Sequence, residues 1–325
     1  MNASPVVRRR CAATAVLFLA AALTSCSDGD DSSGSDDAPD TVSVTHSMGT
    51  TDVPTTPETV VSFSPAWTDA FSALGDPVDV EYRMDGYDDR PWATGDSGTV
   101  KTYTASAEGT ADQSEEIAAV EPDVIFVSYV PDQATYDKLN AIAPTVAVVG
   151  DNTQSDDWRT VTELAGEILD KSDEAAGLVE EVDARFDETK DAHPGLDGAS
   201  AAFGQISEQG LAVVTDDKDP ANGFLTDLGM SLPEDILAAS NDGARAFIAE
   251  ENISLLNTDF LAMWAIGIDP SDLEGWDQLT AVENGSAYLP DATSAMALSQ
   301  PTVASVPWSL DELDDTFAAV DQVRS

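Results

Sequence analysis

The twelve residues of Glu115–Phe126, EEIAAVEPDVIF, have a counterpart in Glu251–Ala262, ENISLLNTDFLA. Aligned without gaps, the two segments carry equivalent side chains at five positions: Glu115 and Glu251, Ile117 and Ile253, Val120 and Leu256, Asp123 and Asp259, and Ile125 and Leu261. Each segment has the pattern of an amphipathic helix followed by a buried strand. The repeat predicts two similar α/β lobes, and one continuous sheet with similar helix-to-strand junctions is the alternative.

A second pair of segments follows the first pair in the same order. YDKLNAI begins at Tyr136 and WDQLTAV at Trp276, and both place an aromatic residue, Asp, Leu, Ala and a β-branched residue at the same spacing. Thr41–His46 alternates like a strand, and further strand candidates lie at Glu58–Pro65, Pro122–Tyr129, Pro144–Gly150 and Ala199–Ser207. Because strands that alternate with helices indicate βαβ units, we expect two Rossmann-like α/β lobes with central, parallel-rich sheets.

The segment between the two halves is different. Residues 156–191 contain no proline and are rich in Ala, Glu and Leu at helical spacing. A break at Ser172 and Asp173 predicts a second helix over Glu174–Ala192, about 28 Å long at 1.5 Å per residue, which can connect two lobes. The expected parts are therefore a signal peptide (1–25), a flexible acidic tether (26–40), an N-terminal lobe (41–155), a helical connector (156–193) and a C-terminal lobe (194–325).

Residues 1–25 have the pattern of an export signal. Three arginines at positions 8–10 precede an apolar run, Cys11–Leu23, that is too short for a transmembrane helix. The run ends in LTSC, which resembles the lipobox of bacterial lipoproteins and makes Cys26 the expected lipidation site. A secretory signal with an incidental cysteine is the alternative, and RRRCAAT matches a twin-arginine signal poorly.

The composition narrows the function classes. The formal net charge of −47 disfavours nucleic acid and anionic membrane surfaces as partners. With only Cys11, Cys26, His46 and His193, neither a disulfide framework nor a metal site built from Cys or His is expected. The sequence has no phosphate-binding glycine loop, no G-x-S-x-G motif and no histidine beside a candidate nucleophile. We therefore expect a protein that is not an enzyme and has no catalytic residues.

Five segments, in their order and spacing and together with the lipobox, resemble the periplasmic-binding-protein-like receptors of bacterial ABC importers that carry ferric siderophores, haem or cobalamin. The segments are VPTTPETVVSFSPAWTDAFSALG, EEIAAVEPDVIF, YDKLNAIAPTV, WDQLTAVENGSAYL and SVPWSLDELDDTF. The resemblance covers Thr41 to Val323. It implies two lobes joined by a single long helix, with the ligand held between them and only modest closure.

The resemblance also implies partners and a location. It implies an ABC permease dimer with its ATPase, and a monomeric receptor that is lipid-anchored at the extracytoplasmic face of the cell membrane. It implies no cofactor and no metal bound directly by the protein, because the iron of a ferric siderophore is held by the siderophore.

Ligand sites in open α/β sheets form at the carboxyl ends of the strands. The candidate ligand-binding residues there are Trp67, Tyr82, Arg83, Trp92, Tyr129, Arg245, Phe247, Trp264 and Met296. Aromatic faces would bury the organic part of a ligand, and arginines would donate to the oxygens around a chelated ferric ion. Core packing is the alternative for Trp67 and Trp264, and a surface ion pair is the alternative for Arg83 and Arg245.

The charge of the chain bears on the ligand. Because acidic residues greatly outnumber basic ones, a neutral or cationic ferric hydroxamate suits the chain better than a trianionic tricatecholate complex. Haem is less favoured, since neither histidine is expected in the cleft, although a tyrosine ligand stays open. The alternatives are a haem or cobalamin receptor of the same family and a surface lipoprotein without a transport role.

The first residue of each repeated segment has a second interpretation. In the receptors that this chain resembles, an acidic residue on each lobe meets arginines of a permease subunit. Glu115 and Glu251 match that position. A carboxylate in the first turn of a helix also stabilises the helix dipole, by about 0.3–1 kcal/mol, so both roles are open.

Overall fold

A computed structural model describes residues 40–87, 90–93, 95, 97–104, 113–151, 154–240 and 243–324. Pro39–Ser325 forms one compact unit. The predicted signal peptide, the lipidation site at Cys26 and nearly all of the predicted tether lie outside the described residues. Within the described ranges, no helix has both the length and the apolar composition needed to cross a membrane.

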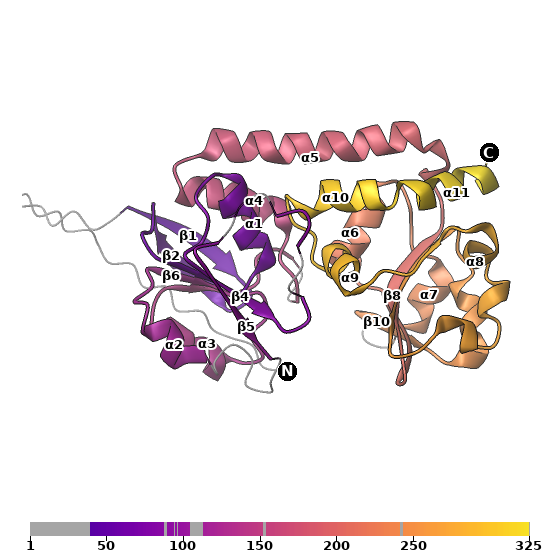
Figure 1. The fold of residues 1–325 in the computed structure, drawn as a ribbon, viewed down its shortest axis with the longest axis horizontal. Helices are drawn as coiled ribbons and strands as arrows, with labels where there is room; N and C mark the ends of the chain where they lie inside the picture. The colour runs from indigo at the N-terminus through magenta and orange to yellow at the C-terminus, as the bar shows by residue number, and fades with distance from the viewer. Residues whose placement is uncertain are drawn as a thin grey trace, which may run out of the picture. The chain divides into compact units, whose positions relative to one another are not determined.

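The N-terminal half of the unit is built on a five-stranded sheet in which every pairing is parallel (Figure 1). From edge to edge the strands are β5 (Thr99–Tyr103), β4 (Val80–Met84), β3 (Val60–Ser62), β6 (Val124–Phe126) and β7 (Thr145–Val146). The helices α1 (Pro65–Ala73), α2 (Ser114–Ala118) and α3 (Gln133–Asn140) lie in this half. A separate antiparallel hairpin precedes the sheet, formed by β1 (Thr41–His46) and β2 (Gly49–Pro54).

Local sequence explains the turn from β3 into α1. Ser64 is extended before the helix, and its side chain accepts a hydrogen bond from the backbone N–H of Trp67. Pro65 lies in the first helical turn, where its fixed φ suits a helix and its missing N–H needs no partner. Gly75 follows the helix with a φ of +77°, a left-handed conformation that favours glycine. The strand predicted within Glu58–Pro65 is therefore present as β3.

The C-terminal half contains a second, separate five-stranded sheet. Its strands, in spatial order, are β10 (Arg245–Ile248), β9 (Gly210–Val214), β8 (Ala201–Ser207), β11 (Phe260–Ile266) and β12 (Ala287–Tyr288). The strands β8, β11 and β12 pair in parallel, whereas β9 and β10 are antiparallel to their neighbours. Two separate sheets exclude the alternative of one continuous sheet, and the predicted two-lobed α/β fold class is confirmed.

Short helices surround this second sheet. The α-helices are α6 (Pro220–Asp227), α7 (Glu234–Ala239), α8 (Thr280–Asn284) and α9 (Ala292–Ser299). The 3-10 helices are η3 (Glu250–Leu256), η4 (Pro270–Asp272) and η5 (Trp276–Gln278). The chain ends with α10 (Ser305–Glu312) and α11 (Asp314–Arg324).

Residues 156–193, predicted as the connector, contain α4 (Trp158–Ile168) and α5 (Ser172–Ala192), and the short η2 (Pro194–Leu196) follows them. The break before α5 lies at Asp170, which has a positive φ of 56°, so α5 begins two residues earlier than predicted. Its 21 residues correspond to about 32 Å. Figure 1 shows α5 extending along both halves.

The two ends of α5 pack into different cores. Ala175, near its beginning, belongs to a cluster of buried apolar side chains in the N-terminal half. Val179, Val182 and Phe186, farther along, belong to a cluster in the C-terminal half. Leu178 lies between them and packs against both clusters. The helix is therefore part of the structure of each half.

The repeated aspartates have the same structural role in both halves. The Asp123 carboxylate accepts hydrogen bonds from the backbone N–H groups of Glu58 and Thr59 at 2.8 and 2.9 Å, directly before β3. The Asp259 carboxylate accepts from the N–H and the hydroxyl of Ser200, both at 2.8 Å, directly before β8. Each aspartate thus fixes the start of the neighbouring strand, which explains why the sequence repeats it.

Candidate functional site

The smaller of two adjoining cavities lies at the carboxyl ends of β3, β4 and β5 and has a volume of about 70 Å³. Its wall contains five aromatic residues: Phe63, Tyr82, Tyr87, Trp92 and Tyr103. The rings of Phe63 and Tyr82 are stacked, with centroids 4.2 Å apart. Burial raises the pKa of Tyr82, Tyr87 and Tyr103, so their hydroxyls stay protonated and can donate hydrogen bonds at neutral pH.

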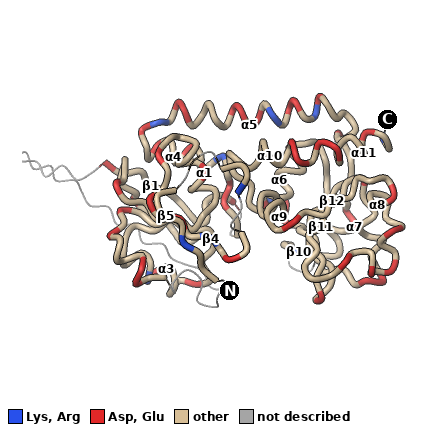
Figure 2. Tube along the Cα trace, viewed as in Figure 1, with Lys and Arg blue, Asp and Glu red and all other residues tan. Residues whose placement is uncertain are grey.

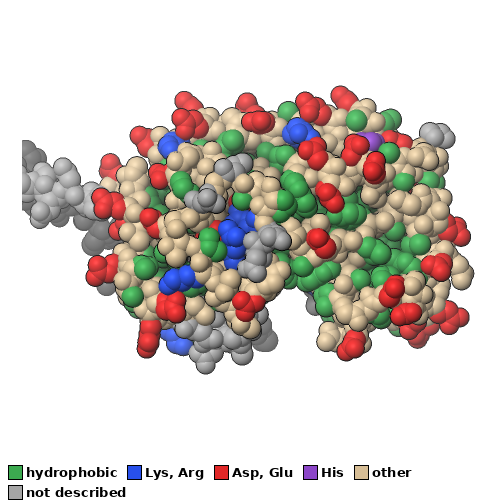
Figure 3. Space-filling model, in the orientation of Figure 1, with side chains coloured by type: hydrophobic (Ala, Val, Ile, Leu, Met, Phe, Trp, Pro, Cys, Tyr) green, Lys and Arg blue, Asp and Glu red, His purple; other side chains and the backbone are tan. Residues whose placement is uncertain are grey.

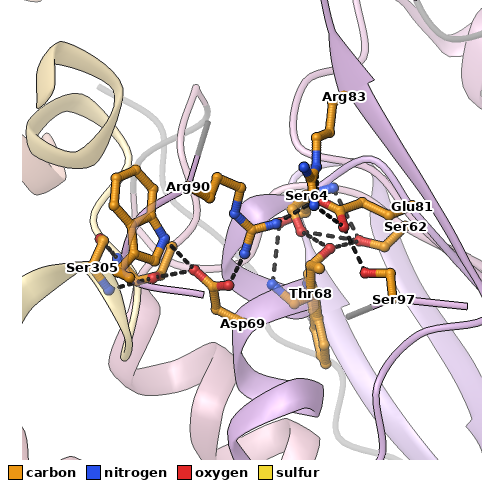
Figure 4. Close-up of polar contacts among 12 residues, drawn as sticks. Ser62, Ser64, Thr68, Asp69, Glu81, Arg83, Arg90, Ser97 and Ser305 are labelled. Atoms are coloured by element: carbon orange, nitrogen blue, oxygen red, sulfur yellow. Dashed lines mark hydrogen bonds and ion pairs between the residues drawn. The ribbon is translucent and has the colours of Figure 1, made fainter. Parts of the chain in front are cut away.

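Four charged residues beside this cavity form what we call the buried ion cluster (Figure 4). Arg90 forms ion pairs with both Asp69 and Glu81, and these three side chains are 9%, 1% and 4% exposed. Glu81 also accepts hydrogen bonds from Arg83 Nε at 2.7 Å and Nη2 at 2.9 Å. The cluster has two positive and two negative charges, and its formal charge is therefore zero.

Burial lowers the pKa of Arg90 to about 10, so the guanidinium remains charged at neutral pH. A buried charge of this kind is stable only when opposite charges or hydrogen bonds compensate for the loss of water. Asp69 and Glu81 provide that compensation, and Ser97 donates a further hydrogen bond to Glu81 at 2.5 Å. The cavity therefore contains arginines without gaining a net positive charge.

The larger cavity adjoins the smaller one and has a volume of about 580 Å³. Met84, Tyr87, Met296 and Gln300 line both cavities, which together we call the cleft. Side chains of both sheets face the larger cavity, and the rings of Tyr87 and Trp264 approach each other from opposite sides, with centroids 6.4 Å apart. A volume of this size suits a small organic ligand.

Charges in the cleft contrast with those on the rest of the molecule. Figure 2 shows acidic residues on most elements and few basic ones. In Figure 3, a group of basic side chains lies beside the hollow between the two halves, whereas acidic side chains are spread over the visible face and are most numerous at its outer edge. In the larger cavity, burial raises the pKa of Asp219, and the nearby Arg245 acts in the opposite direction. Among the described residues, no group of three or more His, Cys, Asp or Glu side chains could hold a metal ion.

A family model described as "Periplasmic binding protein" matches residues 60–292. The chain belongs to this family. The proteins of the family bind solutes, and this confirms the sequence prediction that the chain is not an enzyme.

Individual relatives agree with this assignment. The chain is 30% identical over 171 residues to the Bacillus subtilis (strain 168) protein named "Probable siderophore-binding lipoprotein YfiY", over 52% of this chain and 51% of that protein. The chain thus spans about half the length of this curated relative. A solved periplasmic solute binding protein from Mycobacterium smegmatis is 26% identical, with a TM-score of 0.69, over 87% of this chain and 99% of that one. PiaA from Streptococcus pneumoniae, solved with ferrichrome, is 22% identical, with a TM-score of 0.68, over 87% and 99% of the two chains, and shows the same fold.

The structure brings most of the predicted ligand-binding residues together. Tyr82, Arg83, Trp92 and Met296 line the smaller cavity. Arg245, Phe247 and Trp264 line the larger one, together with Met296. Phe247 is 67% exposed, which is unusual for a large apolar side chain and leaves its ring accessible from the cleft.

Two predicted residues do not line either cavity. Trp67 is fully buried in the N-terminal core, where its ring stacks on Phe126 with centroids 4.0 Å apart. For Trp67 the core-packing alternative is therefore correct. Tyr129 follows β6 but is about half exposed and is absent from the walls of both cavities. Its position after a strand places it near the correct edge of the sheet but outside the cleft.

Several residues of the site were not predicted. Tyr87 and Arg90 lie in the same polar loop as Trp92, and the density of aromatic and basic residues in that loop was the available signal. Asp69 and Glu81 had no such signal, because a chain with 61 acidic residues offers many equivalent candidates.

Glu115 and Glu251 lie at equivalent places in the two halves. Glu115 is in the first turn of α2, and Glu251 is in the first turn of η3. Both side chains are exposed, and among the described residues neither carboxylate has a hydrogen bond or an ion pair. Their accessibility suits a contact with another molecule.

Proposed function

We propose that this chain is the ligand-binding component of an ABC importer and that it binds an iron(III)–siderophore complex in the cleft. The observation that carries the proposal is the cleft itself, in which aromatic side chains of both halves surround a volume suited to a small organic molecule. The similarity to a protein named as siderophore-binding, and to one solved with ferrichrome, supports this ligand class.

A hydroxamate-type complex fits the charges of the cleft better than a tricatecholate complex. Arg83 and Arg90 are already compensated by the carboxylates of Asp69 and Glu81. In the smaller cavity, a trianionic ligand would therefore lose its hydration without gaining an uncompensated positive partner. The oxygens of a neutral ferric hydroxamate need hydrogen-bond donors but no net positive charge, and arginines and tyrosines provide such donors.

A haem receptor is a weaker alternative. His46 is hydrogen-bonded to Thr51 at 2.9 Å, and His193 to Asp314 and Asp321 at 3.0 and 2.9 Å. Neither histidine is among the residues that line the cleft. Axial ligation of haem iron would therefore depend on tyrosine or methionine.

A fluorescence titration of the purified full-length chain tests the ligand. The probes are the gallium(III) complexes of the metal-free ferrichrome and ferrioxamine ligands, which are colourless and keep the charge of the ferric forms, with a gallium tricatecholate, haem and cobalamin alongside. We expect a saturable change in tryptophan fluorescence with the two hydroxamates, because Trp92 and Trp264 line the cleft. Trp264→Phe should reduce this change, whereas Trp158→Phe, in the C-terminal core, should not. A tight tricatecholate complex would contradict the hydroxamate assignment, and no response to any probe would contradict the receptor function.

The proposed delivery step requires a location and a partner. We propose a monomer that is anchored through Cys26 at the extracytoplasmic face of the cell membrane and meets the permease through Glu115 and Glu251. Glu115→Lys and Glu251→Lys should each reduce cellular uptake of ferrichrome labelled with radioactive iron, while leaving ligand affinity unchanged. Glu163→Lys, an exposed position on α4, is the matched control for charge reversal. A loss of affinity in either variant would exclude the docking role.

A further inference from the structure

Asp69, a buried residue of α1, joins parts of the chain that are far apart in sequence (Figure 4). Its carboxylate forms an ion pair with Arg90 and accepts hydrogen bonds from Trp92 Nε1 at 3.1 Å and from Thr302 Oγ1 at 2.5 Å. Arg90 and Trp92 line the smaller cavity, whereas Thr302 lies three residues before the start of α10. One carboxylate therefore links the wall of the ligand cavity to the C-terminal part of the chain.

A second contact reinforces this link. Trp308, in α10, packs against Trp92, and the centroids of the two rings are 5.1 Å apart. At the start of the same helix, Thr302 Oγ1 accepts a hydrogen bond from the N–H of Ser305, and Ser305 Oγ accepts one from the N–H of Thr302, both at 2.9 Å. This reciprocal pair fixes Thr302 at the position from which it donates to Asp69.

We propose that Asp69 is a positioning residue for ligand binding, an inference that rests on the proposed function. Asp69 orients Arg90 and Trp92 at the cavity wall, and Thr302 couples that orientation to α10. Without Asp69, Arg90 would keep Glu81 as its carboxylate partner and could turn towards it. The buried indole N–H of Trp92 would lose its acceptor. Side chains that bind a ligand with specificity need such supporting contacts to stay in the productive orientation.

Thr302 provides the sharpest test, because it is buried and is not among the residues that line either cavity. Thr302→Val removes the hydroxyl with little change of shape and should weaken binding of gallium ferrichrome about two- to tenfold. Thr302→Ser keeps the hydroxyl and should restore affinity. Ser305→Ala removes the hydrogen bond to the Thr302 N–H but leaves the Thr302 hydroxyl in place, so it should weaken binding less than Thr302→Val does. Unchanged affinity in Thr302→Val would overturn the proposal.

Asp69→Asn is compared with Asp259→Asn, a matched control. Asp259 also pairs with an arginine, Arg324 at 3.0 Å, and with a serine hydroxyl, but it lies at the start of β11, outside the residues that line the cleft. Asp69→Asn should weaken binding, and Asp259→Asn should lower the melting temperature without changing affinity. If both variants bound the ligand with equal affinity, Asp69 would have only a structural role, and the proposal would be contradicted.

Hydrogen exchange of the ligand-free chain separates this proposal from the proposed function. The amides of Tyr87 and Ala93 donate to Met84 and Arg90 at 3.1 and 3.0 Å in the loop that lines the smaller cavity. Both amides should exchange faster in Asp69→Asn and Thr302→Val than in the wild type and in Asp259→Asn. Unchanged exchange would show that Asp69 does not position this loop. A wild-type chain that binds no probe would refute the receptor function, and the exchange rates would still decide the role of Asp69.

Discussion

Replacing Arg90 with Met should destabilise the protein far more than replacing Arg159 with Met, although each arginine bridges two carboxylates. Arg90 is 9% exposed, and its partners are almost completely buried. Arg159 is 32% exposed and pairs with Asp183 and Asp227 near the surface. The two substitutions remove the same group from the same kind of pair, so the difference between them isolates the effect of burial.

The expected magnitudes follow from these environments. Removing one partner of a buried ion pair typically costs about 3–5 kcal/mol of the free energy of unfolding, because the remaining charge has lost its compensation. Asp69 would keep two hydrogen bonds, and Glu81 would keep Arg83, so we expect the lower end, about 3 kcal/mol. A surface ion pair contributes about 1 kcal/mol or less, and the contact between Arg159 and the ring of Trp158 adds about 0.5–1 kcal/mol.

Urea unfolding at pH 7 measures the loss of the free energy of unfolding in both variants, provided that their m-values equal that of the wild type. A second measurement at pH 5 gives a signature of the mechanism. Carboxylates left without Arg90 should take up protons in the folded state, so the Arg90→Met variant should regain stability at pH 5 relative to the wild type. The reasoning would be refuted if Arg90→Met lost no more stability than Arg159→Met, or if its loss were the same at both pH values.

Two further substitutions test titrating groups outside the ion cluster. Burial lowers the pKa of His193, but its hydrogen bonds to Asp314 and Asp321 outweigh burial and raise the pKa above 6.5. Protonated His193 therefore stabilises the folded state fully below pH 6.5, and this contribution to the free energy of unfolding is lost as the pH rises through the raised pKa. His193→Asn should remove this decline from the pH profile of urea unfolding, and an unaltered profile would exclude the contribution. Burial raises the pKa of Asp156 to about 7, although a hydrogen bond from Ser64 acts in the opposite direction. The folded state therefore keeps a proton that the unfolded state releases near pH 3.8. Between pH 4 and 7 the free energy of unfolding should fall by up to about 1.4 kcal/mol per pH unit. Asp156→Asn should abolish that slope, and a slope that persists would place the titrating group elsewhere.

The fold could be predicted because its signals are local or repeated. The short apolar runs become strands, and the segment without proline becomes the connector helices. The antiparallel strands β9 and β10 were not expected, since Gly210–Val214 and Arg245–Ile248 carry no mark of strand direction. Direction depends on the connections between strands, and the sequence of a strand alone does not determine it.

The predicted residues that line the cleft include aromatic residues and also Arg83, Arg245 and Met296. Trp92 lies in a polar loop, where core packing is a weaker explanation for an aromatic side chain, and it lines the smaller cavity. Trp67 was assigned to the site because it follows a strand, yet Trp67, Ala70, Phe71 and Leu74 have the spacing of one helix face, and all four are buried. The helical periodicity therefore indicates a core position for Trp67. No comparable pattern marks Asp69, whose partners come together only through tertiary structure.

The repeat that opens the sequence contains two kinds of acidic residue, and the structure separates them. Asp123 and Asp259 are each bonded to the chain directly before a neighbouring strand, so the fold itself accounts for their repetition. Glu115 and Glu251 are exposed in both halves, and no hydrogen bond or ion pair with the described residues accounts for theirs. Stabilisation of a helix dipole is a weak reason for a glutamate at η3, which is a short 3-10 helix with a non-helical residue at Asn252. The fold therefore leaves the repetition of this pair without a structural reason, and this supports the proposal that Glu115 and Glu251 meet the permease.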